Sequence, residues 1–339
     1  MFNVTCISDD GFLDSPELLI LSLHISSAIS TPIYILGMYC ILYKTPKAME
    51  SIKWYLFALH IWIMSFDYSI SLLLIPFVLF PQLAWIPNGL LQYFGVSPVV
   101  QNAVVVLAAS CVAVSVVSIY ENRFFILCEF GWKPKWAILR RFWLTFHYMA
   151  GFLWPLPALL FLVPEQNAAR LIVFRNLPCL PEYLYNENVF VLNLELKENL
   201  ISLALLAGFP SAEIEFFILC LTWNTRQQLK SRRISPATYQ LQKKFFIALV
   251  IQTVIPVIML SIPFVIMLGI FQFDYRNQAL LNFGALIITT HGAVATVTMI
   301  LVHRPYRLAV REMITGLGFW STRTVPVAVA LKISTASMT

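Results

Sequence analysis

Residues 99–123 read VVQNAVVVLAASCVAVSVVSIYENR, a mostly apolar run that ends in a charged triplet. A helix needs about 20 mostly apolar residues to cross a bilayer, and Val99–Tyr120 has that length. Six further stretches of the same kind lie along the chain: Leu18–Tyr43, Trp54–Phe80, Phe142–Val163, Leu200–Trp223, Phe245–Phe271 and Ala279–Val302. The sequence therefore predicts an all-α membrane protein, a bundle of seven transmembrane helices.

The composition excludes a soluble globular protein. Of the 339 residues, 59% are hydrophobic and only 12% are charged. Soluble domains carry about 25% charged residues, so this chain has too little polar surface to stay in water. The seven spans take up most of the length, and a single membrane domain accounts for it better than two soluble domains.

The basic residues predict the orientation of the bundle. With the N-terminus outside, 19 of the 23 Lys and Arg residues fall in cytoplasmic segments and 4 fall outside. Short cytoplasmic loops carry an excess of Lys and Arg, so we expect the N-terminus outside and the C-terminus inside. The net charge of +6 thus reflects membrane topology, and we expect no binding to nucleic acid.

These features divide the chain into four predicted parts. Residues 1–17 form an acidic extracellular tail, which lacks the basic start of a cleaved signal peptide. Residues 18–306 form the seven-helix domain. Residues 307–320 have the pattern of an amphipathic helix beside the membrane, and residues 321–339, rich in Ser, Thr and Ala, form a disordered cytoplasmic tail.

The outer segments carry two candidate modifications. Asn3 begins an Asn-Val-Thr glycosylation sequon. Cys6 and Cys179 are the two cysteines that fall outside the membrane on the oxidising side, where a pair tends to bridge. We expect a disulfide between them, with two free thiols as the alternative. The second outer loop, Pro164–Asn199, is the longest and is a candidate lid over the bundle.

Ionisable side chains at membrane depth are expensive and are functional candidates. Asp67 lies at the midpoint of the second span and His291 near the midpoint of the seventh, and these helices are neighbours in a seven-helix receptor bundle. The two side chains either pair directly, hold an ion between them, or each satisfy another buried polar group.

Glu213 and Glu215 lie about 200° apart around a helix. They cannot form a dyad: at most one faces a ligand cavity, while the other contacts a neighbouring helix.

Glu121-Asn122-Arg123 closes the third span at its cytoplasmic end. This place is similar to one that holds an acidic–basic switch in many seven-helix receptors, where an arginine can pair inside the inactive bundle and be released toward a partner in the active one. The alternative is an arginine that only reaches toward the membrane surface from a helix end. We favour the switch because of where the triplet falls.

Enzyme signatures are missing from the sequence. The five histidines lie on different elements without metal-ligand spacing. There is no nucleophile elbow, phosphate-binding loop or dinucleotide fingerprint, and Asp67 has no second membrane aspartate for a protease dyad. We therefore expect no enzyme activity, no cofactor and no metal.

Short motifs at the ends of the spans are more specific than hydropathy. In chain order they are Ser15-Pro16-Glu17, Tyr39–Pro46, Lys53-Trp54, the residues His60, Trp62, Asp67, Ser71 and Pro76, then Gly95-Val96, Glu121-Asn122-Arg123, Leu177–Pro181, His291-Gly292 and His303–Arg307. In this order and spacing, from about Cys6 to Arg307, the chain resembles the nematode serpentine chemoreceptors of class H, the Srh family. One departure is Ala295-Thr296, where the family often has Ser-Thr.

The resemblance implies a seven-helix G-protein-coupled receptor in the plasma membrane of chemosensory cells, often in their cilia. It implies a small external chemical as ligand and a heterotrimeric G protein as partner. It marks Glu121, Arg123, Tyr306 and Arg307 as residues of the cytoplasmic face, and the basic loop that holds Arg232 and Arg233 would meet the same partner. The alternatives are a seven-helix ligand-gated channel, whose inverted topology the charge distribution opposes, and a transporter, whose inverted repeats are not visible.

Overall fold

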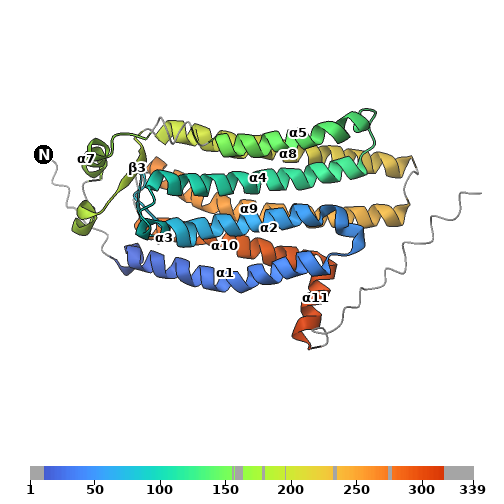
Figure 1. Ribbon diagram of the computed structural model, residues 1–339, viewed down its shortest axis with the longest axis horizontal. Helices are drawn as coiled ribbons and strands as arrows, with labels where there is room; N and C mark the ends of the chain where they lie inside the picture. Colours follow the sequence, from blue (N-terminus) through green and yellow to red (C-terminus); the bar gives the residue numbers. More distant parts are fainter. Residues whose placement is uncertain are drawn as a thin grey trace, which may run out of the picture.

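Long helices packed side by side make up most of the molecule (Figure 1). The computed structural model describes residues 11–154, 156, 163–177, 180–194, 196–231, 235–273 and 277–316. A small sheet and a short helix cover one end of the bundle, and at the other end a last helix runs across the bundle axis (Figure 1).

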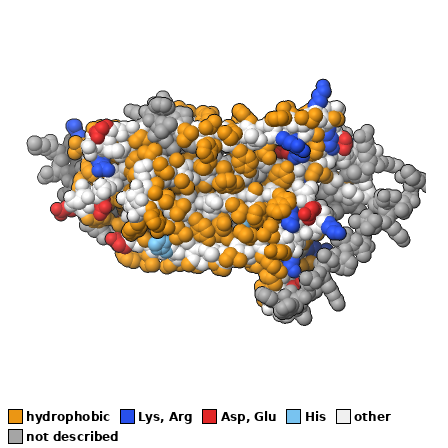
Figure 2. Space-filling model, viewed as in Figure 1, with side chains coloured by type: hydrophobic (Ala, Val, Ile, Leu, Met, Phe, Trp, Pro, Cys, Tyr) orange, Lys and Arg blue, Asp and Glu red, His pale blue; other side chains and the backbone are white. Residues whose placement is uncertain are grey.

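Seven helices of the described residues form the bundle, which confirms the predicted architecture: α1 (Pro16–Lys44), α2 (Glu50–Tyr68), α4 (Pro98–Leu127), α5 (Lys133–Leu153), α8 (Leu196–Lys230), α9 (Pro236–Phe273) and α10 (Gln278–Val302). Among the described residues, six of them are long and apolar enough to cross a membrane. The other is α5, which packs on α4 within the bundle. Figure 2 shows apolar side chains over the middle of the molecule and charged ones at its two ends, as lipid on the outside requires.

The helices extend beyond the apolar spans on the side predicted to be cytoplasmic. The segment 121–141 between the third and fourth apolar spans is mostly helical, because α4 continues to Leu127 and α5 already begins at Lys133. Most of the segment 224–244 between the fifth and sixth spans is also helical. Hydropathy marks only the residues that lie in lipid, whereas Lys, Arg and Gln are good helix formers in water.

The second span ends earlier than predicted. It does not reach Phe80: α2 ends at Tyr68, a π-helical turn η3 (Ser69–Leu74) follows, and Ile75 takes a left-handed conformation with φ 43°. The residue before a proline is disfavoured in a helix, and Pro76 comes next. The chain therefore turns out of the bundle at Ile75.

A three-stranded antiparallel sheet lies beyond that turn, with strands β1 (Pro76–Val78), β2 (Leu83–Pro87) and β3 (Phe190–Asn193) in that order. The sequence predicted an all-α protein, so these strands were not expected. β1 and β2 form a hairpin in which Phe77 and Ala84 are buried. The described residues also form several short segments: α3 (Leu90–Tyr93), α7 (Gln166–Asn176), and the 3-10 turns η1 (Phe12–Asp14), η2 (Lys47–Met49) and η4 (Glu182–Asn186).

We call β1, β2, β3, α7 and η4 the outer cap. Its buried core joins Phe77 of β1, Val173 of α7 and Leu184 of η4 to Leu19 and Leu23 of α1. The second outer loop is thus a folded element that shares a core with the bundle.

The last helix, α11, runs from Arg304 to Ile314. It starts earlier than the predicted residue 307 because Pro305 suits the first turn of a helix. Tyr306 and Ala309 are buried against the bundle, whereas Arg307 and Arg311 are exposed. The predicted end, residues 317–320, lies outside the described residues.

The edge of β3 is held by one side chain, and we expect its removal to loosen the outer cap. Gln166 accepts from Val191 N at 3.0 Å and donates to Val191 O at 3.0 Å, on the side of the strand away from β2. Gln166→Ala leaves these buried groups unpaired, at a cost of about 1–3 kcal/mol. Hydrogen exchange should become faster at Val191. Exposed Asn167→Ala is the control, and equal exchange in both variants would contradict this assignment.

Candidate functional site

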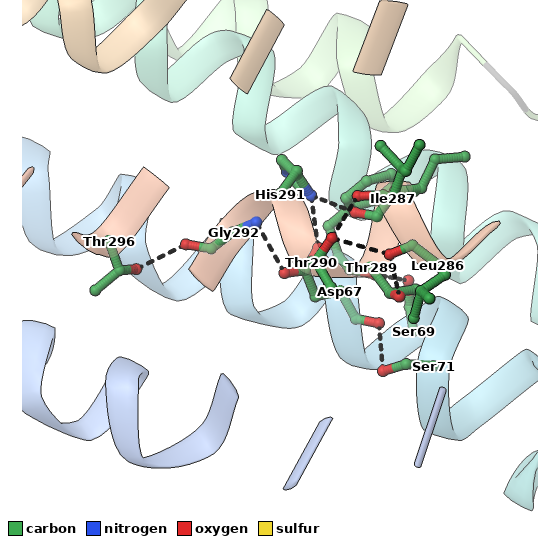
Figure 3. Close-up of polar contacts among 12 residues, drawn as sticks. Asp67, Ser69, Ser71, Leu286, Ile287, Thr289, Thr290, His291, Gly292 and Thr296 are labelled. Carbon is green, nitrogen blue, oxygen red and sulfur yellow. Dashed lines mark hydrogen bonds and ion pairs between the residues drawn. The ribbon is translucent and has the colours of Figure 1, made fainter. Parts of the chain in front are cut away.

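Asp67 is the centre of a polar cluster inside the bundle, and its side chain is almost fully buried. Figure 3 shows it between α2 and α10, beside His291 and Gly292. It lies in the last turn of α2, directly before the π-helical turn η3. Such turns are rare and occur often at functional sites.

Three groups from two other helices contact the Asp67 carboxylate. His291 Nδ1 of α10 lies 2.7 Å from Oδ1, Gly292 N of α10 donates to Oδ2 at 3.1 Å, and the Tyr34 hydroxyl of α1 also donates to Oδ2. Of the alternatives that the sequence left open for Asp67 and His291, the structure has the direct contact. The distance leaves no room for an ion between the two side chains.

The surroundings of His291 define its proton positions. Nδ1 is also 2.6 Å from the carbonyl oxygen of Ile288, which can only accept, so Nδ1 carries a proton. Nε2 is buried without a hydrogen-bond partner among the described atoms. The imidazole ring is thus held only through Nδ1, which lies close to both the Asp67 carboxylate and the Ile288 carbonyl.

The cluster continues along α1 and η3. Ser71 Oγ donates to Asp67 O at 2.8 Å and Ser27 Oγ donates to Ser71 Oγ at 2.7 Å. His60 Nε2 lies 2.9 Å from Tyr34 O. We call these residues, with Asp67, His291 and Gly292, the Asp67 cluster. It joins α1, α2 and α10 by hydrogen bonds at membrane depth.

Glycine at position 292 permits this close approach. A methyl group added there would meet Asp67 Oδ2, Ile63 and the Tyr34 hydroxyl, the last at 2.7 Å. Gly37 of α1 is similar, since a methyl there would lie 2.9 Å from the His60 ring. Small residues let membrane helices approach in this way.

Glu213 and Glu215 lie on different faces of α8, as expected. Glu213 contacts α5, where His147 Nε2 lies 3.0 Å from both of its carboxylate oxygens. Glu215 is exposed on the outside of the bundle, so the expectation that the second glutamate contacts a neighbouring helix is wrong. The sequence reasoning missed His147. The sequence does show a histidine within the fourth predicted span. It does not show that this side chain lies next to Glu213, which is 66 positions away.

The triplet at the inner end of α4 is arranged differently from the prediction. Glu121 pairs with Arg140 of α5 at 2.7 Å and accepts from Trp136 Nε1 at 2.8 Å. Arg123 is buried and lies 4.2 Å from the ring centre of Phe245 of α9. Its Nε and Nη2 atoms have no hydrogen-bond partner among the described atoms. Arg123 is thus held against α9 by stacking on the Phe245 ring.

The other residues predicted for the cytoplasmic face differ in exposure. Tyr306 is buried and bonds Thr45 Oγ1 at 2.8 Å, and burial raises the pKa of its hydroxyl to about 12. Arg307 is exposed and donates to Leu301 O at 2.7 Å. Burial, with nearby Arg123, lowers the pKa of His303 to about 4, so His303 is neutral at physiological pH.

Several predicted residues lie outside the described part of the chain: Asn3, Cys6, Cys179, Arg232 and Arg233. Within the described part, Cys40, Cys111, Cys128 and Cys220 are free thiols. No group of His, Cys, Asp and Glu side chains there is placed to hold a metal ion.

Comparison with known proteins gives a consistent result. The family model described as "Serpentine type 7TM GPCR chemoreceptor Srh" matches residues 14–316. Serpentine receptor class H-72 of Caenorhabditis elegans is 26% identical over 315 residues, which cover 92% of this chain and 90% of that protein. The crystal structure of squid rhodopsin matches with a TM-score of 0.57 at 11% identity, over 88% of this chain and 85% of that one. The rhodopsin likeness concerns the fold alone.

We expect Gly292→Ala to destabilise the bundle, because the added methyl overpacks the Asp67 cluster at a cost of about 1–3 kcal/mol. Thermal unfolding, followed by labelling of the buried cysteines, should shift down by several degrees. Gly208→Ala is the matched control, since a methyl group there meets nothing within 4 Å. Equal shifts in the two variants would show that the approach at Gly292 is not tight.

Asp67 and His291 should be energetically coupled. In a double-mutant cycle with Asp67→Asn and His291→Ala, the losses in unfolding free energy should fail to add by about 0.5–3 kcal/mol. The control cycle pairs Asp67→Asn with His147→Ala on α5, where the losses should add. Strict additivity in the first cycle would remove the pairing as a stabilising contact.

Proposed function

The chain belongs to the Srh family of serpentine seven-transmembrane G-protein-coupled chemoreceptors, and we propose that it binds a small external chemical and activates a heterotrimeric G protein. Members of this family are multi-pass membrane receptors rather than enzymes. We place the protein in the plasma membrane of sensory cells, including their cilia, with the N-terminus outside. The distribution of Lys and Arg supports that orientation.

The observation that carries the proposal is the state of Arg123. Its guanidinium is buried at the inner end of α4, and two of its nitrogen atoms have no hydrogen-bond partner in the part of the chain that the structure describes. Leaving buried charged donors without acceptors costs free energy. An acceptor offered from the cytoplasm would satisfy them, provided that the ring of Phe245 moves away. Arg123 is therefore suited to bind a partner in a second arrangement of the helices.

The inner half of α9 is the element that must move. It is held by the Arg123–Phe245 stacking, by Tyr120 OH donating to Thr253 Oγ1 at 3.1 Å, and by Gln252 Oε1 at 3.2 Å from His303 Nε2. No ion pair between described residues fastens α9 to the bundle. By contrast, α4 and α5 are joined at the same level by the Glu121–Arg140 pair.

The ligand acts by binding one arrangement better than the other, because equal affinity for both would shift nothing. We place it in the outer half of the bundle, between the outer cap and the Asp67 cluster. The cluster connects α1, α2 and α10, and α10 in turn packs along α9. A displacement of α10 at its outer end can therefore be transmitted to the inner half of α9 through the packing of the two helices.

The test measures nucleotide exchange on purified G-protein heterotrimers by membranes that contain the full chain, with and without a panel of small water-soluble organic chemicals. Phe245→Ala should raise exchange in the absence of any added chemical, because it removes the ring that holds Arg123. Arg123→Ala should lose most of the stimulated exchange. Exposed Arg141→Ala, which removes an equal charge on the neighbouring helix, is the control and should respond as the unmodified chain does.

Two results would count against the proposed mechanism. Normal stimulation in Arg123→Ala would remove the role given to that residue. Failure of every heterotrimer to respond to Phe245→Ala, at normal surface expression, would argue against release of α9 as the activating step.

A further inference from the structure

A second polar site lies on the other side of the bundle from the Asp67 cluster. A cavity of about 340 Å³ opens among α4, α5 and α8, and it extends from the middle of α8 toward the inner end of α4. Aromatic rings make up most of its wall, and one carboxylate enters it, that of Glu213. We call it the aromatic cavity. Ligand pockets of this volume are common in proteins.

The Glu213 carboxylate shares a proton with His147. His147 Nδ1 lies 2.8 Å from the carbonyl oxygen of Trp143, which can only accept, so Nδ1 carries a proton. Nε2 lies 3.0 Å from both Glu213 oxygens, so one more proton must lie between the ring and the carboxylate. His147 is 8% exposed. The pair is therefore electrically neutral as a unit and holds one transferable proton.

Around Glu213, in the middle of α8, the aromatic cavity faces the lipid. Phe209 and Phe216, two residues of its wall, are 60% and 57% exposed on the outer surface of α8. A molecule that reaches Glu213 from this face must therefore dissolve in the bilayer first. Charged molecules are excluded from that route, and neutral apolar ones are not.

We propose that the aromatic cavity binds a small lipid-soluble amine with an apolar, ring-containing body. The amine enters in its neutral form. Its nitrogen lone pair takes the proton shared by His147 and Glu213, and a new N–H bond forms. The product is an ammonium ion on the Glu213 carboxylate, beside a neutral His147 that keeps its Nδ1 proton on the Trp143 carbonyl. No proton enters or leaves the membrane, so the charge of the whole site stays zero.

The walls favour an amine over other lipid-soluble molecules. An ammonium ion over the face of Trp, Tyr or Phe gains cation–π attraction, most strongly where water is excluded. Trp143 and Phe217 line the cavity together with Glu213. An alcohol of the same shape takes no proton and gains only one hydrogen bond, and a carboxylic acid has no basic lone pair to take the proton. The proposal concerns a site separate from the one placed beneath the outer cap, and its test involves no G protein.

The experiment measures equilibrium binding of radiolabelled 4-phenylbutylamine to the full chain in phosphatidylcholine nanodiscs, after subtraction of its partition into empty nanodiscs. We expect saturable binding, with 4-phenylbutan-1-ol competing at least about tenfold more weakly. Glu213→Gln should weaken binding of the amine by about tenfold or more. Glu215→Gln is the matched control, because Glu215 lies on the same helix and points out of the bundle, and it should bind as the unmodified chain does.

A second variant keeps the test decisive if Glu213→Gln fails to fold. Ala212 lines the cavity and is exposed, so Ala212→Phe fills the space and leaves the His147–Glu213 pair in place. Binding should then be lost. The proposal is overturned if the alcohol competes as well as the amine, if Glu213→Gln and Glu215→Gln bind equally, or if no saturable binding exceeds the partition into empty nanodiscs.

Discussion

The buried Asp67 carboxylate is the constraint on which the bundle depends. In hydrocarbon a carboxylate needs partners, since no water supplies them. Here α10 offers His291 and the backbone N–H of Gly292, and α1 offers the Tyr34 hydroxyl. These contacts set how closely the three helices approach and require glycine at position 292. The π-helical turn that follows Asp67 then leads the chain out at Ile75, so the start of the outer cap also follows from this part of α2.

The helices on the other side of the bundle are held by weaker means. α8 and α9 contact each other little, and α9 is fixed mainly through α10 and the stacking of Arg123 on Phe245. The polar pair between α5 and α8, His147 with Glu213, is open to lipid on one side. The molecule thus combines a hydrogen-bonded core of α1, α2 and α10 with helices whose positions rest on packing. Membrane proteins that change shape need both kinds of attachment.

The sequence predicted the features that depend on the solvent and missed those that depend on helix rotation. Apolar length predicts a spanning helix because a bilayer has a fixed thickness. Equal depth in neighbouring helices made the contact of Asp67 with His291 one of three open alternatives. The partner of Glu121 could not be predicted in this way. Arg140 lies 19 positions away, and it reaches Glu121 only because α5 begins at Lys133, which hydropathy does not show. His147 and Glu213 meet through the rotation of two helices about their axes. The strands Pro76–Val78 and Phe190–Asn193 are too short to give a periodic signal of their own.

The outer cap has a consequence for timing. Its core includes Leu19 and Leu23 of α1 and Phe77 of β1, and Trp85 with Phe190 packs against Val99 of α4. The mouth of the bundle above these helices is therefore closed by folded apolar structure, so a water-borne molecule meets a barrier before it meets a site. Under the proposed function, association requires part of this apolar core to open, and we expect it to be slower than the about 10⁵–10⁷ per molar per second usual for open protein surfaces.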